Sequence, residues 1–212
     1  MRTRLLQTTI FLLMALISIQ KVRAQIYGET AFLQGCYIEV AVAECGVYGS
    51  DDAVPASGPF GPYHDNVFVG LGFVADHEKD GWDESTGAGE PDFCGDYFTP
   101  GSPEEGWAIE YDGDEWYNHY VPCSAFSFDI DGAVVGYTDT GGYKSATWEG
   151  EIDDIDLGIT QYTVFPDGAL FFLTSVELCN NGATDMVDVY YMRNVDPDQD
   201  QPVCGTFMTT NY

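Results

Sequence analysis

Three carboxylates at alternate positions near the C-terminus are the residues of this sequence best suited to chemistry. Asp196, Asp198 and Asp200 lie in the segment DPDQD, where Pro197 stiffens the backbone. Hard cations such as Ca²⁺ prefer oxygen ligands, and a loop that curls can turn alternate side chains toward one point. The segment lacks the glycine and the distal glutamate of an EF-hand loop, so a site here needs its own geometry. The sequence predicts a calcium site at these residues, with a solvated acidic turn as the alternative.

Other acidic residues and the histidines give weaker indications of a site. One further acidic loop surrounds Gly81-Trp82, and another acidic group is expected to form the rim of a plain β-turn. Their carboxylates are Asp76, Asp80, Asp83 and Glu84 in the first and Asp153, Asp154 and Asp156 in the second. His64, His77 and His119 have no HExxH or paired spacing of a zinc site. No residue lies in the context of an activated nucleophile, so we predict no catalytic residue.

A carbohydrate-binding or carbohydrate-cleaving module is the alternative function that the sequence leaves open. Glycoside hydrolases and lyases use carboxylates, which are plentiful here. Tryptophan side chains could stack on sugar rings, and the chain has four of them: Trp82, Trp107, Trp116 and Trp148. A deep aromatic cleft with two carboxylates would favour a hydrolase, whereas aromatic residues buried in a core would favour a structural or adhesive module.

The predicted calcium loop follows two runs that alternate as β-strands do. In 169–179, the residues on one side are mostly apolar and those on the other grade to polar, so we expect a strand buried at its start. The first side holds Leu170, Phe172, Thr174, Val176 and Leu178. Asn180-Asn181-Gly182 tolerates positive φ, and 186–194 alternates in turn, so the sequence predicts a hairpin. We expect Phe172, Val176, Val189 and Tyr191 to face one another across this hairpin or across the sandwich.

The rest of the chain predicts an all-β fold. Further strand-like runs are 37–44, 67–74, 106–111, 124–130, 133–137, 144–151, 155–165 and 203–209, separated by turn residues. In the first run we expect Ile38, Val40 and Val42 to point inward. Residues 25–34 read as a lead-in, and 46–66 and 76–105 as long loops. Short strands with frequent turns are typical of an antiparallel β-sandwich, here with long disulfide-held loops.

The N-terminus has the pattern of a secretory signal. Arg2 and Arg4 precede an apolar run, 10–19, and Val22 and Ala24 have the spacing of a cleavage site. An uncleaved membrane anchor is the alternative, but the run is shorter than the ~20 residues that span a bilayer. We therefore predict a signal peptide at 1–24, a single domain at 25–212, an extracellular or cell-surface location, and no membrane insertion after cleavage.

The predicted mature chain is strongly acidic. Four of the seven basic residues lie in 1–24, and all 35 acidic residues follow it, so its net charge is 3 − 35 = −32. Such a surface repels nucleic acid and anionic lipid, and it suits divalent cations, high salt or a basic partner. The alternative is that the acidity only provides solubility.

Six cysteines in a chain with a secretory signal predict three disulfides. They are Cys36, Cys45, Cys94, Cys123, Cys179 and Cys204, and none forms a CxxC motif. We pair Cys179 with Cys204, since both flank the acidic loop. If 37–44 is one strand, its two flanking cysteines are ~30 Å apart and cannot bond each other. These two then pair with Cys94 and Cys123, in an order that the sequence leaves open.

Several segments resemble a module of large secreted surface proteins of Bacteroidetes, described as uncharacterised or adhesin-like. They are GCYIEVAVAECGVYGS, GLGFVADHEKDGW, GDYFTPGSPEEGW, TGGYKSATWEG and the stretch from ITQYTVFPDGALFF to NVDPDQDQ. The resemblance implies a large, mutarotase-like β-sandwich and a surface location, and it is tied to no activity. In such proteins further domains follow, whereas this chain stops at Tyr212, so truncation at the C-terminus is an open alternative.

These observations together predict a secreted, disulfide-bonded and calcium-stabilised β-sandwich. We expect it to act as a structural or adhesive module of the cell surface. Its expected partners are other cell-surface proteins or glycans.

Overall fold

The computed structural model describes residues 25–50, 52–63, 71–75, 96–98, 105–119, 123, 129–140 and 142–195. These residues form three antiparallel sheets, so the all-β prediction is confirmed. The first sheet has five strands in chain order. They are β1 (Gln25–Tyr27), β2 (Thr30–Gln34), β3 (Ile38–Val42), β4 (Phe73–Ala75) and β5 (Asp96–Phe98). Among the described residues, no helix has the length and apolar character needed to span a bilayer.

The other two sheets are built from the second half of the chain. One has three strands in the order β12-β6-β7, and the other has four in the order β11-β10-β9-β8. The three-stranded sheet contains β6 (Glu105–Tyr111), β7 (Asp114–His119) and β12 (Tyr190–Val195). The four-stranded sheet contains β8 (Asp131–Thr140), β9 (Tyr143–Ile152), β10 (Leu157–Pro166) and β11 (Leu173–Asn180). A single 3-10 turn, Asp153–Ile155, joins β9 to β10 where the sequence predicted a β-turn.

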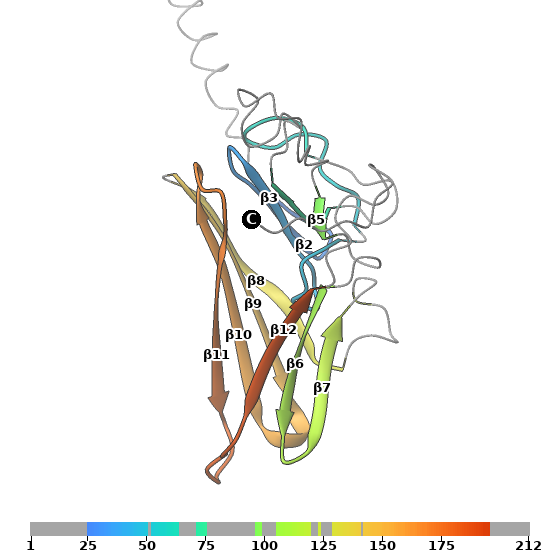
Figure 1. Cartoon of the computed structure of the whole chain (residues 1–212), viewed down its shortest axis with the longest axis vertical. Helices are drawn as coiled ribbons and strands as arrows, with labels where there is room; N and C mark the ends of the chain where they lie inside the picture. The colour runs from blue at the N-terminus through green and yellow to red at the C-terminus, as the bar shows by residue number, and fades with distance from the viewer. Residues whose placement is uncertain are drawn as a thin grey trace, which may run out of the picture.

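The four-stranded sheet forms one layer against which the two other sheets pack (Figure 1). At one end of β9 and β10 the buried side chains meet those of β6, and at the other end they meet those of β2 and β3. Strands of ten residues reach ~33 Å, which is long enough to cover two shorter sheets in turn. The result is compatible with a β-sandwich whose second layer is divided between two sheets.

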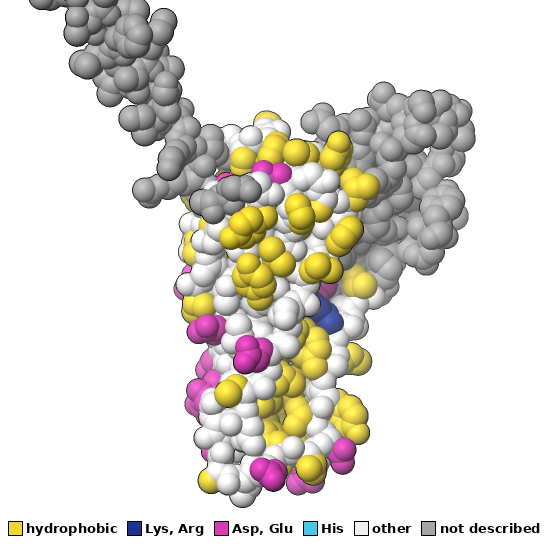
Figure 2. Space-filling view, turned by 90° about the vertical axis from the view of Figure 1, so that its left-hand side faces the viewer, with side chains coloured by type: hydrophobic (Ala, Val, Ile, Leu, Met, Phe, Trp, Pro, Cys, Tyr) yellow, Lys and Arg dark blue, Asp and Glu magenta, His cyan; other side chains and the backbone are white. Residues whose placement is uncertain are grey.

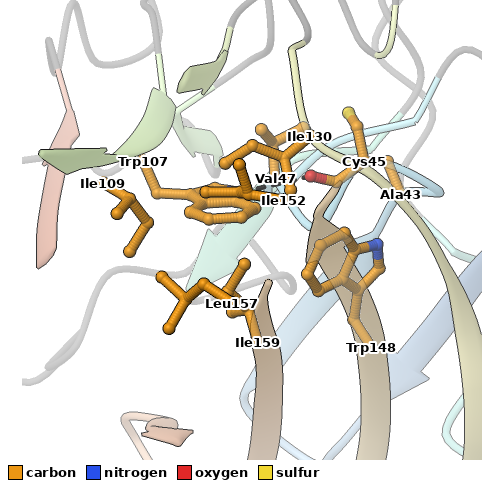
Figure 3. Packing of buried hydrophobic residues seen from close by; sticks show 10 residues of the cluster. All are labelled: Ala43, Cys45, Val47, Trp107, Ile109, Ile130, Trp148, Ile152, Leu157 and Ile159. Carbon is orange, nitrogen blue, oxygen red and sulfur yellow. Dashed lines mark hydrogen bonds between the residues drawn. The ribbon is translucent and has the colours of Figure 1, made fainter. Parts of the chain in front are cut away.

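The lower core, which lies between the three-stranded and the four-stranded sheet, is centred on two tryptophans. Trp107 on β6 and Trp148 on β9 are both almost fully buried and meet edge to face, with ring centroids 5.2 Å apart (Figure 3). The Trp148 indole lies over Gly132 and Gly150, which are paired across β8 and β9. A Cβ at Gly150 would come within 2.2 Å of the indole, so glycine is required there for steric reasons.

The upper core lies between the five-stranded and the four-stranded sheet, and it joins β2 and β3 to the far ends of β9 and β10. Its buried members are Ala31, Leu33, Ile38, Val40, Val42, Tyr48, Ala146 and Phe165. The opposite side of β2 and β3 is also covered, because Phe32 and Ala41 pack with Tyr63, Leu71 and Val74. The inward positions predicted for Ile38, Val40 and Val42 are confirmed, but both faces of this strand are buried.

The predicted hairpin between 169–179 and 186–194 is wrong. β11 pairs with β10, and β12 pairs with β6 in the other layer, so their connection crosses the sandwich. No residue of Asn180-Asn181-Gly182 has positive φ; Asp188 has it instead. Asn180 Oδ1 accepts the N–H of Gly182, a local turn that does not require two strands to pair.

The side chains of the two strands nevertheless meet as the alternation predicts, across the sandwich. Val176, Val189 and Tyr191 pack against the lower core, and Phe172 packs against the upper one. The expected burial at the start of the strand is wrong on its outward side, because Phe171 and Leu173 are 62% and 61% exposed. The outward side of β11 is therefore apolar at the end where the sequence predicted a buried strand.

Several strand boundaries also differ from the predictions. The lead-in 25–34 is a pair of strands, β1 and β2, and β7 follows the Asp112-Gly113 turn where no strand was predicted. β5 lies within a predicted loop. Of the run 67–74 the described part begins at Leu71, and the predicted strands 124–130 and 203–209 fall mostly or wholly outside the described residues.

Candidate interaction surface and the buried polar groups

A buried ion pair connects all three sheets. Arg193 on β12 donates from Nε to Glu105 Oε1 on β6 at 2.5 Å and from Nη1 to Gln161 Oε1 on β10 at 2.7 Å. Its Nη2 donates to the carbonyl of Gly46 at 3.0 Å, and its guanidinium lies 3.9 Å from the ring centroid of Tyr48. Gly46 and Tyr48 follow β3, so one side chain links the five-, three- and four-stranded sheets.

The environment of this pair identifies it as structural. Burial raises the pKa of Glu105, while Arg193 and the Tyr48 N–H, which donates to Oε2 at 2.7 Å, oppose that rise. Burial alone would lower the pKa of Arg193, but Glu105, Tyr48 and Tyr191 together outweigh burial and the pKa is raised. The arginine therefore stays a cation inside the sandwich, with its donors satisfied by protein acceptors. Neither residue was predicted from the sequence to have such a role.

A second buried cation, Lys144, lies on β9 of the four-stranded sheet. Lys144 Nζ is 2.5 Å from Asp139 and 2.7 Å from Asp167, and its side chain is almost fully buried. It also lies over the Phe60 ring, 5.3 Å from its centroid. Burial lowers the pKa of Lys144, but the two aspartates outweigh burial and raise it. Lys144 and Arg193 are thus both neutralised within the chain.

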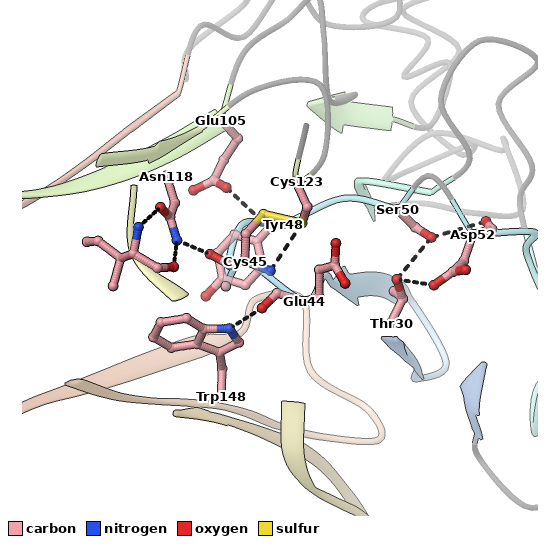
Figure 4. The surroundings of a disulfide bond; sticks show 12 residues. Thr30, Glu44, Cys45, Tyr48, Ser50, Asp52, Glu105, Asn118, Cys123 and Trp148 are labelled. Atoms are coloured by element: carbon pink, nitrogen blue, oxygen red, sulfur yellow. Dashed lines mark hydrogen bonds between the residues drawn. A yellow bond between two sulfur atoms is a disulfide. The ribbon is translucent and has the colours of Figure 1, made fainter. Parts of the chain in front are cut away.

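The disulfide between Cys45 and Cys123 ties the end of β3 to the segment between β7 and β8 (Figure 4). This is one of the two pairings that the sequence left open for Cys45. Around it, the indole N–H of Trp107 and Nδ2 of Asn118 both donate to the Cys45 carbonyl, and Trp148 donates to the carbonyl of Glu44. The bond therefore fixes backbone acceptors that the core tryptophans use.

The remaining predicted disulfides involve cysteines outside the described residues. Cys36 and Cys179 bond no other described cysteine, and their predicted partners, Cys94 and Cys204, are not described. The pairing of Cys179 with Cys204 therefore stays a prediction. Cys179 is exposed, near the end of β11.

The predicted metal sites are not brought together by the described part of the chain. Asp196, Asp198 and Asp200 lie outside it, as do Asp76, Asp80, Asp83 and Glu84. Asp153, Asp154 and Asp156 are exposed on the turn between β9 and β10. Among the described residues, no three His, Cys, Asp or Glu side chains are grouped as metal ligands would be.

The tryptophans that can be placed line the core rather than a cleft. Trp107 and Trp148 are buried in it, and Trp116 packs against it. Trp82, His64 and His77 lie outside the described residues, while His119 stacks on Tyr117 with ring centroids 4.9 Å apart. On the criterion set by the sequence, this placement favours a structural or adhesive module.

The outward side of the four-stranded sheet carries the most distinctive exposed surface, which we call the graded face. Its upper part is apolar and consists of Val135, Tyr143, Tyr162, Leu173 and the half-buried Val164, and the exposed Phe171 lies just before β11. Its lower part is acidic and consists of Asp131, Glu149, Glu151 and Glu177. In the view of Figure 2, hydrophobic side chains are most numerous in the upper half, a narrower strip of them continues downward, and most acidic side chains lie in the lower half.

The strand register explains why these residues form two zones. Val164 pairs with Leu173, and Tyr143 pairs with Pro166, so apolar residues lie side by side at one end. Thr160 pairs with both Glu149 and Glu177, and Glu151 pairs with Asp131, so the acids form rows at the other end. The face is not evident from the sequence because each strand contributes only a few outward residues.

Comparison with known proteins gives no relative: no family model matches the chain, and neither a curated protein nor a solved structure is significantly similar to it.

Proposed function

We propose that this chain is a secreted structural or adhesive module of the cell surface. The observation that carries the proposal is that the side chains best suited to binding a ligand are used inside the fold. Trp107 and Trp148 form the core, and both described cations are consumed by internal ion pairs, so the sandwich is a scaffold. What it offers to a partner is the exposed graded face. An apolar exposed patch of this kind marks a surface for interaction.

The disulfide supports the location. Disulfides persist in oxidising compartments, and the Cys45–Cys123 bond closes 78 residues of separation in the chain. The predicted signal at 1–24 and the predicted charge of the mature chain agree with an extracellular role. The proposed calcium ion at Asp196, Asp198 and Asp200 would add to the stability of the same scaffold.

Surface labelling of intact producing cells tests the proposal. An antibody against the mature chain should stain unpermeabilised cells, and external protease should remove the signal. Beads coated with the oxidised chain should bind intact cells or extracellular proteins, and beads coated with the reduced, unfolded chain should not. Staining only after permeabilisation would contradict the proposal.

Carbohydrate binding is a second candidate, favoured by the outward side of the three-stranded sheet. Tyr117 and Tyr190 are exposed there, and Met192 lies in the row of Tyr117 through Ala108. Exposed aromatic rings on a sheet can stack on sugars. A glycan array with wild type and a Tyr117→Ala, Tyr190→Ala variant separates this candidate from protein adhesion.

A further inference from the structure

We propose that the graded face docks a protein surface in which apolar side chains lie beside lysines or arginines. The inference rests on the proposed function and names the partner of that module by its chemistry. Two zones of one continuous sheet surface must be matched at once, one apolar and one anionic. A partner that covers both buries hydrophobic area and neutralises four carboxylates.

The spacing of the zones defines the partner further. Leu173 and Glu177 lie on the same side of β11, four residues apart, which corresponds to ~13 Å along the strand. Tyr162 lies between their rows, pairing with Thr147 and Ser175. The partner therefore needs its apolar and its basic groups about 13 Å apart on a flat or extended surface.

A second copy of this chain is a poor occupant because it lacks cations. Residues 25–212 contain three basic residues, Lys79, Lys144 and Arg193. Lys144 is held by Asp139 and Asp167, and Arg193 is held by Glu105, both inside the sandwich. Lys79 lies outside the described residues, and one lysine does not balance four carboxylates. The charge of the chain opposes self-association further.

A designed peptide provides a direct probe of this chemistry. In an extended chain, acetyl-LSLSLSKSKSK-amide places three leucines and then three lysines on one side, with the second leucine and the first lysine four residues, or ~13 Å, apart. The matched control peptide has glutamate at each lysine position. Both are titrated, with a fluorescent label, into the full oxidised chain at low and at high salt.

Four variants report where the probe binds. Leu173→Ser and the double variant Glu149→Gln, Glu177→Gln alter the two zones of the face. Val187→Ser, at a residue 70% exposed, makes a similar apolar-to-polar change elsewhere on the surface, and Glu115→Gln, on β7, removes one carboxylate away from the face. All four changes are at exposed side chains, so the melting temperature should stay within about 2 °C of wild type.

We expect the lysine peptide to bind and the glutamate peptide not to bind. Leu173→Ser and the double variant should each weaken binding at least fivefold, and only the double variant should reduce its dependence on salt, since screening acts on the charged zone. Val187→Ser and Glu115→Gln should leave the affinity unchanged.

Other outcomes overturn the inference. No binding of the lysine peptide at 1 mM, equal binding of both peptides, or equal effects of face and control variants would each refute it. A dimer in sedimentation that Leu173→Ser abolishes would identify a second copy as the occupant. A drop of more than 5 °C in the melting temperature of Leu173→Ser would show that another part of the chain already covers the face. Surface labelling of cells depends on none of these results, so the proposed function is judged separately.

Discussion

Arg193 Nε lies 2.5 Å from Glu105 Oε1, and this contact joins two strands separated by 88 positions in the sequence. Glu105 begins β6, and Arg193 lies in β12 beside it, opposite Gln161 of the other layer. Through the contact of Arg193 with Gln161, the pair also joins the three-stranded sheet to the four-stranded sheet. A buried pair of this kind stabilises the fold only while both members are present, because removal of one leaves the other charge buried and unpaired.

Replacing Arg193 by Met should therefore destabilise the fold by about 3–5 kcal/mol. Urea denaturation of the oxidised chain measures the change. The double variant Arg193→Met, Glu105→Leu should recover much of the loss, because it leaves no unpaired charge in the interior. If the single and double variants lose the same stability, the ion pair is not the reason for the loss.

Replacing Gly150 by Ala should destabilise the fold by roughly 1–3 kcal/mol, since an added Cβ would come within 2.2 Å of the Trp148 indole. The backbone of Gly150 needs no positive φ, so the effect is steric. Gly168→Ala is the matched control, because a Cβ there meets nothing within 4 Å. Thermal unfolding that shows equal shifts for both variants would contradict this account of the tryptophan pocket.

Removing the Cys45–Cys123 bond as a double serine variant should cost about 4 kcal/mol. The bond spans 78 residues, and loop-closure entropy gives a value of this size. Cys179→Ser provides a comparison at an exposed cysteine. Wild type should also lose stability in reductant, whereas the double serine variant should lose less. Identical sensitivity of both to reductant would place the important disulfide elsewhere.

Alkaline pH should unfold the protein steeply. Burial raises the pKa of Tyr63 and of Tyr137 above the usual 10.0, and the aspartates beside Lys144 raise its pKa above the usual 10.5. In each case the unfolded chain loses its proton first. The stability from these groups is therefore complete below about pH 10 and is lost as the pH rises further.

Absorbance at 295 nm and circular dichroism, followed together from pH 9 to pH 12.5, check this prediction. The ionisation of buried tyrosines should coincide with loss of sheet signal. Tyr63→Phe, which removes one of these groups together with its hydrogen bond to the Phe32 carbonyl, should make the transition shallower. Tyrosines that all ionise while the fold persists would rule the mechanism out.

Local alternation was sufficient to predict the strands that form one layer. The runs 144–151 and 155–165 correspond to β9 and β10, in which apolar side chains such as Trp148 and Ile159 recur every second residue on the inward side. β2 was missed because all five of its residues are buried, so its pattern carries no period. Burial on both faces depends on segments distant in sequence.

Pairing between strands was harder to predict than the strands themselves. Asn180-Asn181-Gly182 has the composition of a hairpin turn, yet β12 pairs with β6, which precedes it by about 80 residues. In the sequence, the only indication that Arg193 faces inward is its position on the same side of the strand as Tyr191. Its partner Glu105 has no local signal, because a buried ion pair is specified by the packing of layers.

Calcium should raise the melting temperature if Asp196, Asp198 and Asp200 share an ion. Binding to the folded state alone stabilises by roughly 3 kcal/mol at a hundredfold excess over the dissociation constant. Magnesium should do less at equal concentration, because it demands stricter octahedral geometry and holds its waters. Sodium at matched ionic strength reproduces the part that comes from screening of an acidic surface. Asp198→Asn should lose the calcium-specific shift, while Asp154→Asn, at an exposed aspartate of the β9–β10 turn, should keep it. A full shift in Asp198→Asn would show that the loop is only an acidic turn.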